Sequence, residues 1–446
     1  MQSDNLLKSN TYTFYKFVLL FLVLLLTRFH SFGQSHGYFL QKGKKIEIPF
    51  NYVNGLIELN VKLNDVNLKF IFDTGSEHTI LSNNVLASLL NIVPSKEIEV
   101  YGADFTKKIK AYITYPVNIK IFNSYIKNNS VTTLDVKSSQ NDIEKKNPSF
   151  IVRNMPILLL ETDIFNFNMA ENGIQGILGA SFFSNSILKI DYKKEKITVY
   201  PYDYNLSLKS YKEMPVHFVG HKPIIKTKIK INKDDLVTDI NILMDTGSSI
   251  PLLFLDNIDS KLLLPKKTII GKLGIGLGGN LNGYIGLIDN IEFGKFQFHG
   301  QISKFQYIDS IKTKTINKTR DGILGNDILK KFTIIIDNFR KTLYFKPNRD
   351  YYKPIKYDKS GINIFATGKN HNQFYIKSII NGSPADIAGL KPNDRIYSAQ
   401  YFNYIFWSHE KLVNLFKKKD NKKIRLKIIR NGKKHVFKFR LKDMLR

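Results

Sequence analysis

Asp73-Thr74-Gly75-Ser76 follows the apolar run 68–72 (LKFIF), and Asp245-Thr246-Gly247-Ser248 follows the run 240–244 (INILM). Each copy predicts a buried strand that ends in a carboxylate and then a tight turn. The strand would carry the Asp into a water-poor site, and Gly lets the backbone turn and approach closely. Thr supplies a short hydroxyl, and the Ser hydroxyl can hydrogen-bond the outer carboxylate oxygen. A single copy would more often be an ordinary turn, because short motifs match by chance.

A second duplicated block lies downstream of each copy. Residues 176–182 (GILGASF) lead into 187–192 (ILKIDY), and residues 322–328 (GILGNDI) lead into 333–338 (TIIIDN). The spacing is the same in both halves, since Gly176 to Asp191 and Gly322 to Asp337 each span 15 positions. Such an internal repeat predicts two copies of one fold.

Over roughly residues 45 to 350 this pattern resembles the pepsin-like and retroviral-type aspartic proteases. The resemblance implies two β lobes whose Asp side chains meet across a pseudo-twofold axis, with Asp73 and Asp245 as the catalytic pair. The residues that would support the two catalytic loops are Thr74, Gly75, Ser76, Thr246, Gly247 and Ser248. The hydrophobic-hydrophobic-Gly segments of that family would be 177–179 and 323–325.

The chemistry of two adjacent carboxyl groups can be stated from general principles. Two carboxylates a few ångströms apart cannot both ionise cheaply, so they share one proton and titrate as a unit. The ionised partner can take a proton from water while the protonated partner donates to the scissile carbonyl oxygen. Such a pair would need no metal and no cofactor.

Composition limits the other classes of protein. With 446 residues, 43% of them hydrophobic, the chain should form two or three globular domains. The absence of Cys excludes a thiol nucleophile, a disulfide framework and a Cys-ligated zinc site. The sequence also contains no H-E-x-x-H, G-x-S-x-G or Walker motif.

The N-terminal 33 residues are predicted to be a signal peptide. Lys8 and Lys16 precede the ten-residue apolar run 17–26, which is short for a membrane span, and the small residues Ser31 and Gly33 precede a cut before Gln34. An uncleaved N-terminal anchor is the alternative. We therefore expect export to the periplasm or cell envelope of a bacterium, with membrane contact only through an uncleaved signal segment.

Local patterns predict several elements of the two lobes. Residues 45–72 should form consecutive strands around an Asn54-Gly55 turn, and 80–90 a short helix. Residues 98–119 should form a hairpin. The resemblance implies that this hairpin forms a flap over the cleft with Tyr101 as its aromatic residue, and an ordinary strand Tyr is the alternative. Residues 137–154 are expected to be a surface loop. Gly274, Gly276 and Gly279 match a dinucleotide-binding spacing, but no helical pattern follows, so a glycine-rich hairpin opposite the cleft is favoured.

From about Ser360 the sequence changes character. The string 383–396 (SPADIAGLKPNDRI) predicts a short helix capped by Ser383 and ended by Gly389. This stretch resembles a PDZ domain of the bacterial protease-associated type. The resemblance implies an α/β module that binds peptides beside a sheet edge, with the C-terminal carboxylate of a peptide held by the loop Gly361, Ile362, Asn363 and Ile364. Asn363 stands where a second Gly is common in that family.

The chain is strongly basic, with a net charge of +29. Residues 417–446 hold 14 Lys or Arg against 2 Asp, which could attract nucleic acid or anionic lipid. The cations there alternate with apolar residues, however, as on the solvated face of two strands, and no RNA-binding signature accompanies them. We expect no specific nucleic-acid partner.

Together these patterns predict a mainly β protein with two duplicated acid-protease-like β lobes and a small PDZ-like α/β domain. The expected ranges are 1–33 for the signal peptide, 45–205 for lobe 1, 206–350 for lobe 2 and 355–446 for the PDZ-like domain. The expected activity is that of an exported aspartic endopeptidase (a hydrolase), with peptides or proteins as substrates and a C-terminal peptide as ligand of the PDZ-like domain. The alternative is a peptide-binding scaffold protein with a vestigial protease body.

Overall fold

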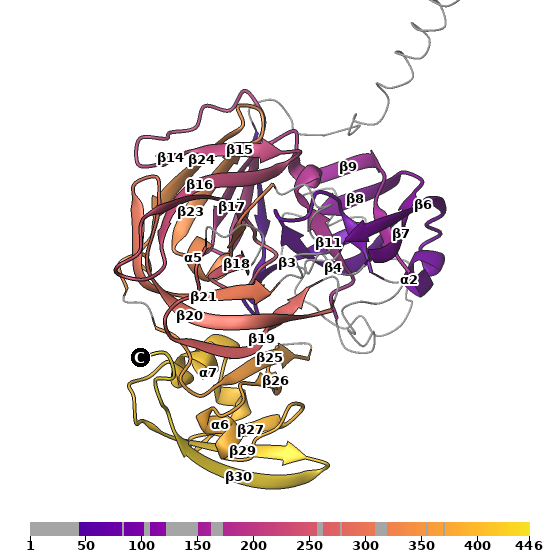
Figure 1. Cartoon of the computed structure of the whole chain (residues 1–446). Helices are drawn as coiled ribbons and strands as arrows, with labels where there is room; N and C mark the ends of the chain where they lie inside the picture. The colour runs from indigo at the N-terminus through magenta and orange to yellow at the C-terminus, as the bar shows by residue number, and fades with distance from the viewer. Residues whose placement is uncertain are drawn as a thin grey trace, which may run out of the picture.

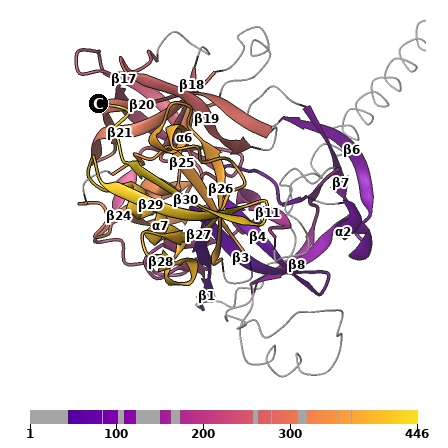
Figure 2. The same ribbon diagram turned by 90° about the horizontal axis from the view of Figure 1, so that it is seen from below.

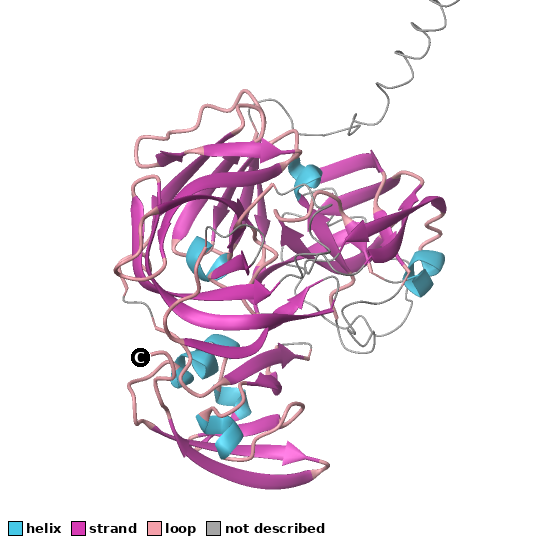
Figure 3. Cartoon of the chain, viewed as in Figure 1, coloured by secondary structure: helices cyan, strands magenta, loops and turns pink. Residues whose placement is uncertain are grey.

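The computed structural model describes residues 44–82, 84–101, 108–121, 150–161, 173–256, 262–276, 279–307, 319–353, 356–368 and 371–446. Strands dominate the described chain and its helices are short (Figure 3). The predicted mainly β class, with two protease-like lobes followed by a PDZ domain, is confirmed. The predicted signal peptide, 1–33, lies outside the described residues.

The first lobe is centred on β4 (Val66–Asp73), which pairs with β3 (Leu56–Leu63) on one side and runs parallel to β11 (Gly176–Gly179) on the other. Phe70 and Phe72 of β4 are 0% exposed, so this apolar strand is buried as its composition predicts. The remaining elements of the lobe are β2 (Asn51–Val53), β5 (Ile80–Leu81), α2 (Asn84–Leu89), β6 (Pro94–Tyr101), β7 (Lys108–Thr114), β8 (Val117–Ile121), β9 (Phe150–Met155), β10 (Leu158–Leu160) and η1 (Ala180–Phe183).

The second lobe repeats this arrangement. Its central strand is β17 (Thr238–Met244), which pairs with β16 (Lys222–Lys230) and runs parallel to β22 (Gly322–Leu324). The remaining elements are β15 (Val216–Val219), β18 (Leu252–Asp256), β19 (Thr268–Gly276), β20 (Gly279–Phe293), β21 (Phe296–Tyr307) and α5 (Asn326–Leu329). The internal repeat in the sequence therefore corresponds to a repeat of strand pairing.

The two lobes share a third sheet, with strand order β1-β13-β12-β23-β24-β14 among the described residues. β12 of the first lobe pairs with β23 of the second, with Lys189 opposite Ile335 at the middle of the ladder. The strands are β1 (Ile46–Pro49), β12 (Ile187–Asp191), β13 (Lys196–Tyr200), β14 (Lys212–Met214), β23 (Phe332–Asp337) and β24 (Thr342–Pro347). One buried apolar cluster includes Phe72 and Phe183 of lobe 1 together with Met244 and Phe254 of lobe 2. The lobes are thus joined by both backbone pairing and a common core.

A separate sheet with its own apolar core follows, drawn in orange to yellow below the second lobe in Figure 1. Its elements are β25 (Ile362–Thr367), β26 (Gln373–Ile379), α6 (Pro384–Ile387), β27 (Arg395–Ala399), β28 (Phe402–Asn403), η2 (Tyr404–Phe406), α7 (His409–Phe416), β29 (Lys423–Arg430) and β30 (Lys433–Arg440). Ser383 caps α6 by accepting a hydrogen bond from the Asp386 amide at 3.3 Å, as its position predicted. β25 lies at one edge of this sheet and β30 at the other, and the view from below shows the sheet in front of parts of both lobes (Figure 2).

Most local predictions agree with the structure. Asn54 and Gly55, with φ of 53° and 79°, form the turn between β2 and β3. The hairpin predicted over 98–119 is β6–β7, whose tip at 102–107 lies outside the described residues. Gly276 and Gly279 face each other in the β19–β20 hairpin, so the dinucleotide spacing is followed by a strand. The prediction of a surface loop over 137–154 was wrong for 150–154, which belong to the buried strand β9, because Phe150 and Val152 face the core.

Candidate active site

Asp73 and Asp245 are delivered to one place by the two central strands. Asp73 is the last residue of β4 and Asp245 follows β17, and both line a cavity of about 1720 Å³ between the lobes. Phe72 and Met244, which precede them, are 0% exposed. The two carboxyl groups are close enough to hydrogen-bond each other. The structure therefore brings together the two Asp residues that the sequence singled out.

The two threonines of the motifs form reciprocal hydrogen bonds between the lobes. The Thr74 hydroxyl donates to the Met244 carbonyl at 2.7 Å and accepts from the Thr246 amide at 3.1 Å. In the reciprocal pair, the Thr246 hydroxyl donates to the Phe72 carbonyl at 2.8 Å and accepts from the Thr74 amide at 3.0 Å. Both threonines are buried. Because each hydroxyl satisfies two backbone groups of the other lobe, the carboxyl groups beside them are held in a fixed relation.

Glycine is required at Gly75 and Gly247 by the approach of the two loops. A Cβ atom on Gly75 would lie 2.7 Å from Cγ of Asp245, and one on Gly247 would lie 2.3 Å from Cγ of Asp73. Each loop therefore passes directly against the carboxyl group of the opposite lobe. A side chain at either position would force the pair apart.

The two carboxyl groups differ in their hydrogen bonding. Asp73 Oδ1 accepts from the amides of Gly75 at 2.7 Å and Ser76 at 3.1 Å, whereas Asp245 Oδ1 accepts from Gly247 at 2.7 Å. Burial raises the pKa of Asp73 above its ordinary value, against these amides and the hydrogen bond from Asp245, which favour its charged form. Burial, followed by the charge of Asp73, raises the pKa of Asp245 much further. The two carboxyl groups therefore hold one proton between them and titrate as a unit.

The Ser76 hydroxyl of the first motif has a different hydrogen-bond partner from the one expected. The Ser76 hydroxyl donates to the His78 carbonyl at 2.9 Å, and it is the Ser76 amide that reaches the Asp73 carboxylate. The expected hydroxyl–carboxylate bond was therefore wrong for Ser76, because the turn directs its amide, and not its side chain, toward Asp73. In the second motif, Ser248 lines the cavity, and its amide contacts the Asp245 carbonyl at 3.4 Å.

Contacts between the lobes add residues that sequence reasoning did not identify. Glu77 Oε1 lies 2.6 Å from Nδ1 of His221, and Glu77 Oε2 accepts from the His221 amide at 3.0 Å. Asn326, 0% exposed, donates to the carbonyls of Gly55 at 2.8 Å and Thr246 at 2.7 Å. The contact of Glu77 with His221 and the hydrogen bond from Asn326 to Gly55 join different lobes, so neither could be read from spacing.

Two cations also line the cavity near the Asp pair. The positive charge of Arg320 lowers the pKa of both Asp73 and Asp245, partly offsetting the effect of burial. Lys222, at the start of β16, is close enough to Asp73 and Arg320 for their charges to act on it, and burial lowers its own pKa. The repeated motif gives no signal for either cation, because each occurs in one lobe alone.

Two hairpins contribute further walls of the cavity. Tyr101, at the end of β6, is 51% exposed and lines the cavity from the first lobe. Leu273, Gly274 and Gly276 of β19 line it from the second lobe. The glycine-rich hairpin therefore does lie at the cleft, as expected from the sequence.

The C-terminal sheet, which begins with β25, and its helix α7 form a further wall of the same cavity. Gly361, Ile362, Asn363 and Ile364, predicted to hold a peptide carboxylate, line the cavity together with α7. Their backbone groups already have internal partners: the Gly361 amide donates to Asp358 Oδ1 at 2.6 Å and the Ile362 amide donates to Ser360 Oγ at 3.0 Å. His409 Nε2 lies 3.2 Å from the Ile364 carbonyl.

The edge of β25 is also engaged by the first lobe. Asn54 Nδ2 donates to the Ala366 carbonyl at 3.0 Å, and Asn54 Oδ1 accepts from the Ala366 amide at 2.9 Å. Ala366 is thus bonded as it would be by a neighbouring strand. The turn residue Asn54 occupies a position where an added peptide strand would pair.

Comparisons with known proteins bear on the C-terminal part most directly. Residues 352–429 match the PDZ domain family, which confirms the PDZ domain predicted from the sequence. No match was found among curated proteins. Among solved structures, the chain is similar to basic 7S globulin from soybean, with 9% identity, 70% of this chain and 97% of that chain covered, and a TM-score of 0.40. It is also similar to conglutin gamma, a basic 7S globulin from lupine seeds, with 11% identity, 70% and 98% coverage and a TM-score of 0.40.

The described part of the chain contains neither a metal-binding cluster nor a membrane-spanning helix. Within it, no group of three or more His, Asp or Glu side chains is arranged to hold a metal ion. No helix among the described residues has the length and apolar character needed to cross a bilayer.

Proposed function

We propose that this protein is an aspartic endopeptidase. The observation that carries the proposal is the hydrogen-bonded pair of Asp73 and Asp245 in a cavity between two similar lobes. The ionised carboxylate of the pair takes a proton from a water molecule, whose oxygen attacks the peptide carbonyl carbon. The protonated carboxyl group gives its proton to the carbonyl oxygen. Collapse of the resulting diol breaks the C–N bond, with a proton passing to the leaving amine.

The PDZ domain supports binding of peptides or proteins by the C-terminal part of the chain. The loop 361–364 of the PDZ domain lines the same cavity as the Asp pair. We therefore propose that the PDZ domain binds the substrates that the protease lobes cleave. The apolar run 17–26 and the small residues before Gln34 support export across a bacterial inner membrane.

The proposal predicts that Asp73→Asn and Asp245→Asn each abolish hydrolysis. Asn cannot replace the base and cannot release a proton, so kcat should fall by at least ~10²-fold, the low end for removing an acid or base. A mixture of synthetic peptides incubated with wild type and each variant, and with a statine-type inhibitor, gives the measurement by mass spectrometry.

The controls separate catalysis from folding. Circular dichroism and melting temperature of each variant should stay close to wild type, because Asn keeps the shape of Asp. Inhibitor-sensitive cleavage by wild type alone supports the proposal. Cleavage that persists in both variants contradicts it, and no cleavage by wild type favours the alternative of a peptide-binding scaffold with a vestigial protease body.

A further inference from the structure

The sheet of the PDZ domain has two sides with different surroundings. Ile424, Leu426 and Ile428 of β29 are buried and share an apolar cluster with Leu412 and Phe416 of α7. α7 lines the cavity that holds the Asp pair. The alternate side chains of β29 therefore point away from that cavity, because successive side chains of a strand face opposite sides.

The side of the sheet opposite α7, which we call the outer face, carries many cations. The registers of β27, β29 and β30 place on it Arg395, Lys423, Arg425, Lys427, Lys434, Lys438 and Arg440. These three strands contain no Asp or Glu. Figure 1 shows β29 and β30 at the end of the molecule away from the two lobes, so the outer face is open to a partner.

The acidic residues of the PDZ domain lie elsewhere. Asp394 pairs with Arg430 at 2.7 Å, and Asp443 lies 3.6 Å from Lys359. The others are Asp386 of α6, Glu410 of α7 and Asp420 in the turn before β29. The Asp420 carboxylate accepts a hydrogen bond from the Asp443 amide at 2.6 Å.

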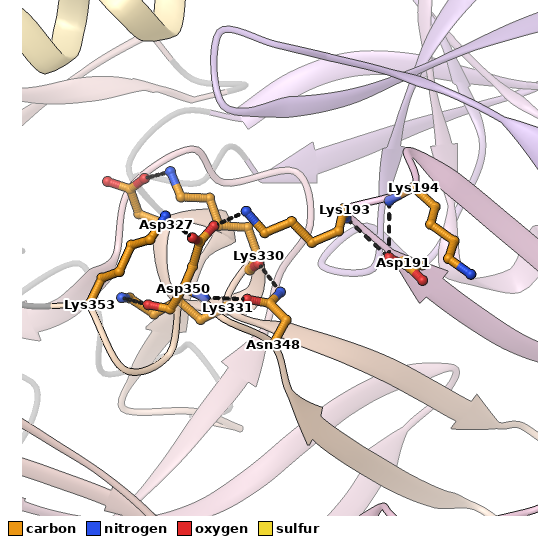
Figure 4. Close-up of polar contacts among 9 residues, drawn as sticks. All are labelled: Asp191, Lys193, Lys194, Asp327, Lys330, Lys331, Asn348, Asp350 and Lys353. Carbon is orange, nitrogen blue, oxygen red and sulfur yellow. Dashed lines mark hydrogen bonds and ion pairs between the residues drawn. The ribbon is translucent and has the colours of Figure 1, made fainter.

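Several lysines of the protease lobes, by contrast, have acidic partners. Asp327 pairs with Lys330 at 2.5 Å, and Asp350 pairs with Lys193 and with Lys353 (Figure 4). Among the described residues, no carboxylate forms an ion pair with a cation of the outer face. The positive charge of the outer face is therefore left for an anionic partner.

Tyrosine rings lie among these cations. Nζ of Lys434 is 4.6 Å from the ring centroid of Tyr397, and Nζ of Lys427 is 5.8 Å from it. The Arg425 guanidinium lies 5.3 Å from the ring centroid of Tyr401. Cations thus occupy ring faces on which nucleic-acid bases would otherwise stack.

One end of the outer face is apolar and exposed. Tyr401, Phe402 and Phe406 are 84%, 60% and 64% exposed, and the rings of Phe402 and Phe406 pack edge to face at 6.5 Å. The Gln400 amide donates to the Arg425 carbonyl at 2.7 Å, which fixes this turn beside the cations. Exposed aromatic rings next to cations are typical of a surface that meets the headgroup region of a bilayer.

We propose that the outer face docks on a bilayer that contains anionic lipids. The cations would contact lipid phosphates, and Phe402 and Phe406 would enter the boundary between headgroups and acyl chains. A nucleic acid offers the negative charge but no apolar phase for these two rings. Docking here leaves the cavity accessible, because α7 and the cavity lie on the other side of the sheet. This contact would be additional to any made by the N-terminal apolar run.

The test uses the protein from Gln34 onward, the form left by the predicted signal cleavage, in sedimentation with lipid vesicles. Wild type should bind vesicles of equal parts phosphatidylglycerol and phosphatidylcholine, and should not bind phosphatidylcholine alone. Lys423→Gln, Lys434→Gln and Lys438→Gln combined should weaken binding ~100-fold, at about 5-fold per cation. The control replaces three exposed lysines of lobe 2 by Gln, namely Lys212, Lys226 and Lys233, and should bind as wild type does.

The apolar contact is tested separately. Phe402→Ser combined with Phe406→Ser should weaken binding at least ~10-fold, because less apolar area enters the bilayer. Leu236→Ser combined with Val237→Ser, two exposed apolar residues of lobe 2, is the matched control. Melting temperatures of all variants should match wild type, since every substituted side chain is exposed.

Three results would overturn the inference. One is equal binding to anionic and neutral vesicles, and another is equal binding by the outer-face variants and their controls. The third is tighter binding to a short DNA duplex than to vesicles, unchanged by the two Phe substitutions, which would assign the outer face to nucleic acid. None of these readouts involves proteolysis, so the inference is independent of the proposed protease function.

Discussion

At the scale of single residues, each half of the site depends on the other. The hydroxyl of Thr74 serves two backbone groups of lobe 2, and the hydroxyl of Thr246 serves two of lobe 1. Gly75 and Gly247 likewise lie against the carboxyl group of the opposite lobe. A substitution in one motif therefore removes or distorts contacts of the other motif.

Replacing Thr74 by Ala should destabilise the protein by roughly 2–6 kcal/mol, because it leaves the buried Thr246 amide and Met244 carbonyl without their partner. Thr74→Ser keeps the hydroxyl and should cost much less. Urea unfolding of both variants, followed by circular dichroism, gives the comparison. If Thr74→Ala and Thr74→Ser lose the same free energy of unfolding, the methyl group of Thr74 and not its hydroxyl stabilises the protein.

The sequence predicted the two Asp residues but not their surroundings. A strand that ends in D-T-G-S is a local pattern, and its duplication made the pairing of Asp73 with Asp245 a specific prediction. The contact of Glu77 with His221 and the approach of Arg320 depend on how one lobe sits against the other. No spacing in the chain encodes that relation, so these residues could not be identified before the structure.

At the scale of elements, the edge of β25 is the clearest departure from expectation. The PDZ family resemblance predicted an open peptide-binding edge beside the loop 361–364. Asn54, which the sequence marked only as a turn residue, instead bonds Ala366 through both its donor and its acceptor. Turn chemistry predicted the backbone at Asn54, whereas the partner of its side chain lies 312 positions away.

Replacing Asn54 by Gly should open this edge. Gly accepts the positive φ of 53° and removes the side chain, so the turn is kept while Ala366 loses its partner. We expect faster hydrogen exchange at the Ala366 amide and roughly 2-fold to 10-fold tighter binding of extended peptides, as for one or two hydrogen bonds.

Asn54→Asp is the matched variant for this experiment. It keeps the acceptor for the Ala366 amide and loses the donor to its carbonyl, so exchange at that amide should stay slow. If Asn54→Gly leaves both exchange and peptide affinity unchanged, the Asn54 contact does not control access to the edge.

At the scale of the whole molecule, the PDZ domain is in contact with both lobes. Tyr357 and Leu445 share an apolar cluster with Leu243 and Leu281 of lobe 2. On the other side, His371 Nε2 lies 3.4 Å from Oε2 of Glu58 in lobe 1. Burial raises the pKa of Glu58 to about 7, against the charge of Lys69, and burial lowers the pKa of His371 to about 4.

These two shifts act on stability in opposite directions. Between about pH 4.5 and 7, folded Glu58 holds its proton more tightly than the unfolded chain does, so its contribution falls as pH rises. Between about pH 4 and 6.5, folded His371 binds its proton less tightly, so its contribution rises with pH. The contributions of Glu58 and His371 should therefore cancel between about pH 4.5 and 6.5, where together they leave the stability of the wild type nearly independent of pH.

Glu58→Gln should remove the contribution of Glu58 to the pH dependence of stability. The melting temperature of the variant relative to wild type should rise from about pH 4.5 to 7 and then level off. The corresponding change in the relative free energy of unfolding is at most ~3 kcal/mol for a pKa shift of this size. Differential scanning fluorimetry across this range gives the measurement.

Glu47→Gln provides a control of opposite sign. Hydrogen bonds from Lys196 and Lys45 lower the pKa of Glu47, so its contribution is present above the ordinary Glu pKa and is lost as pH falls. The melting temperature of this variant relative to wild type should therefore drop as pH rises through the acidic range. A pH-independent difference for Glu58→Gln would show that Glu58 ionises normally in the folded protein.

The ladder between β12 and β23 has a consequence for how the chain is made. While the ribosome has released only the first lobe, β12 can pair with β13 on one side, but its other edge is open because its partner Phe332–Asp337 has not yet been synthesised. An edge of this kind readily pairs with another copy of itself, because antiparallel strands of one sequence can form a symmetric ladder. The open edge of β12 in a nascent first lobe must therefore be kept from pairing with other nascent chains until β23 of the second lobe has been synthesised and pairs with it.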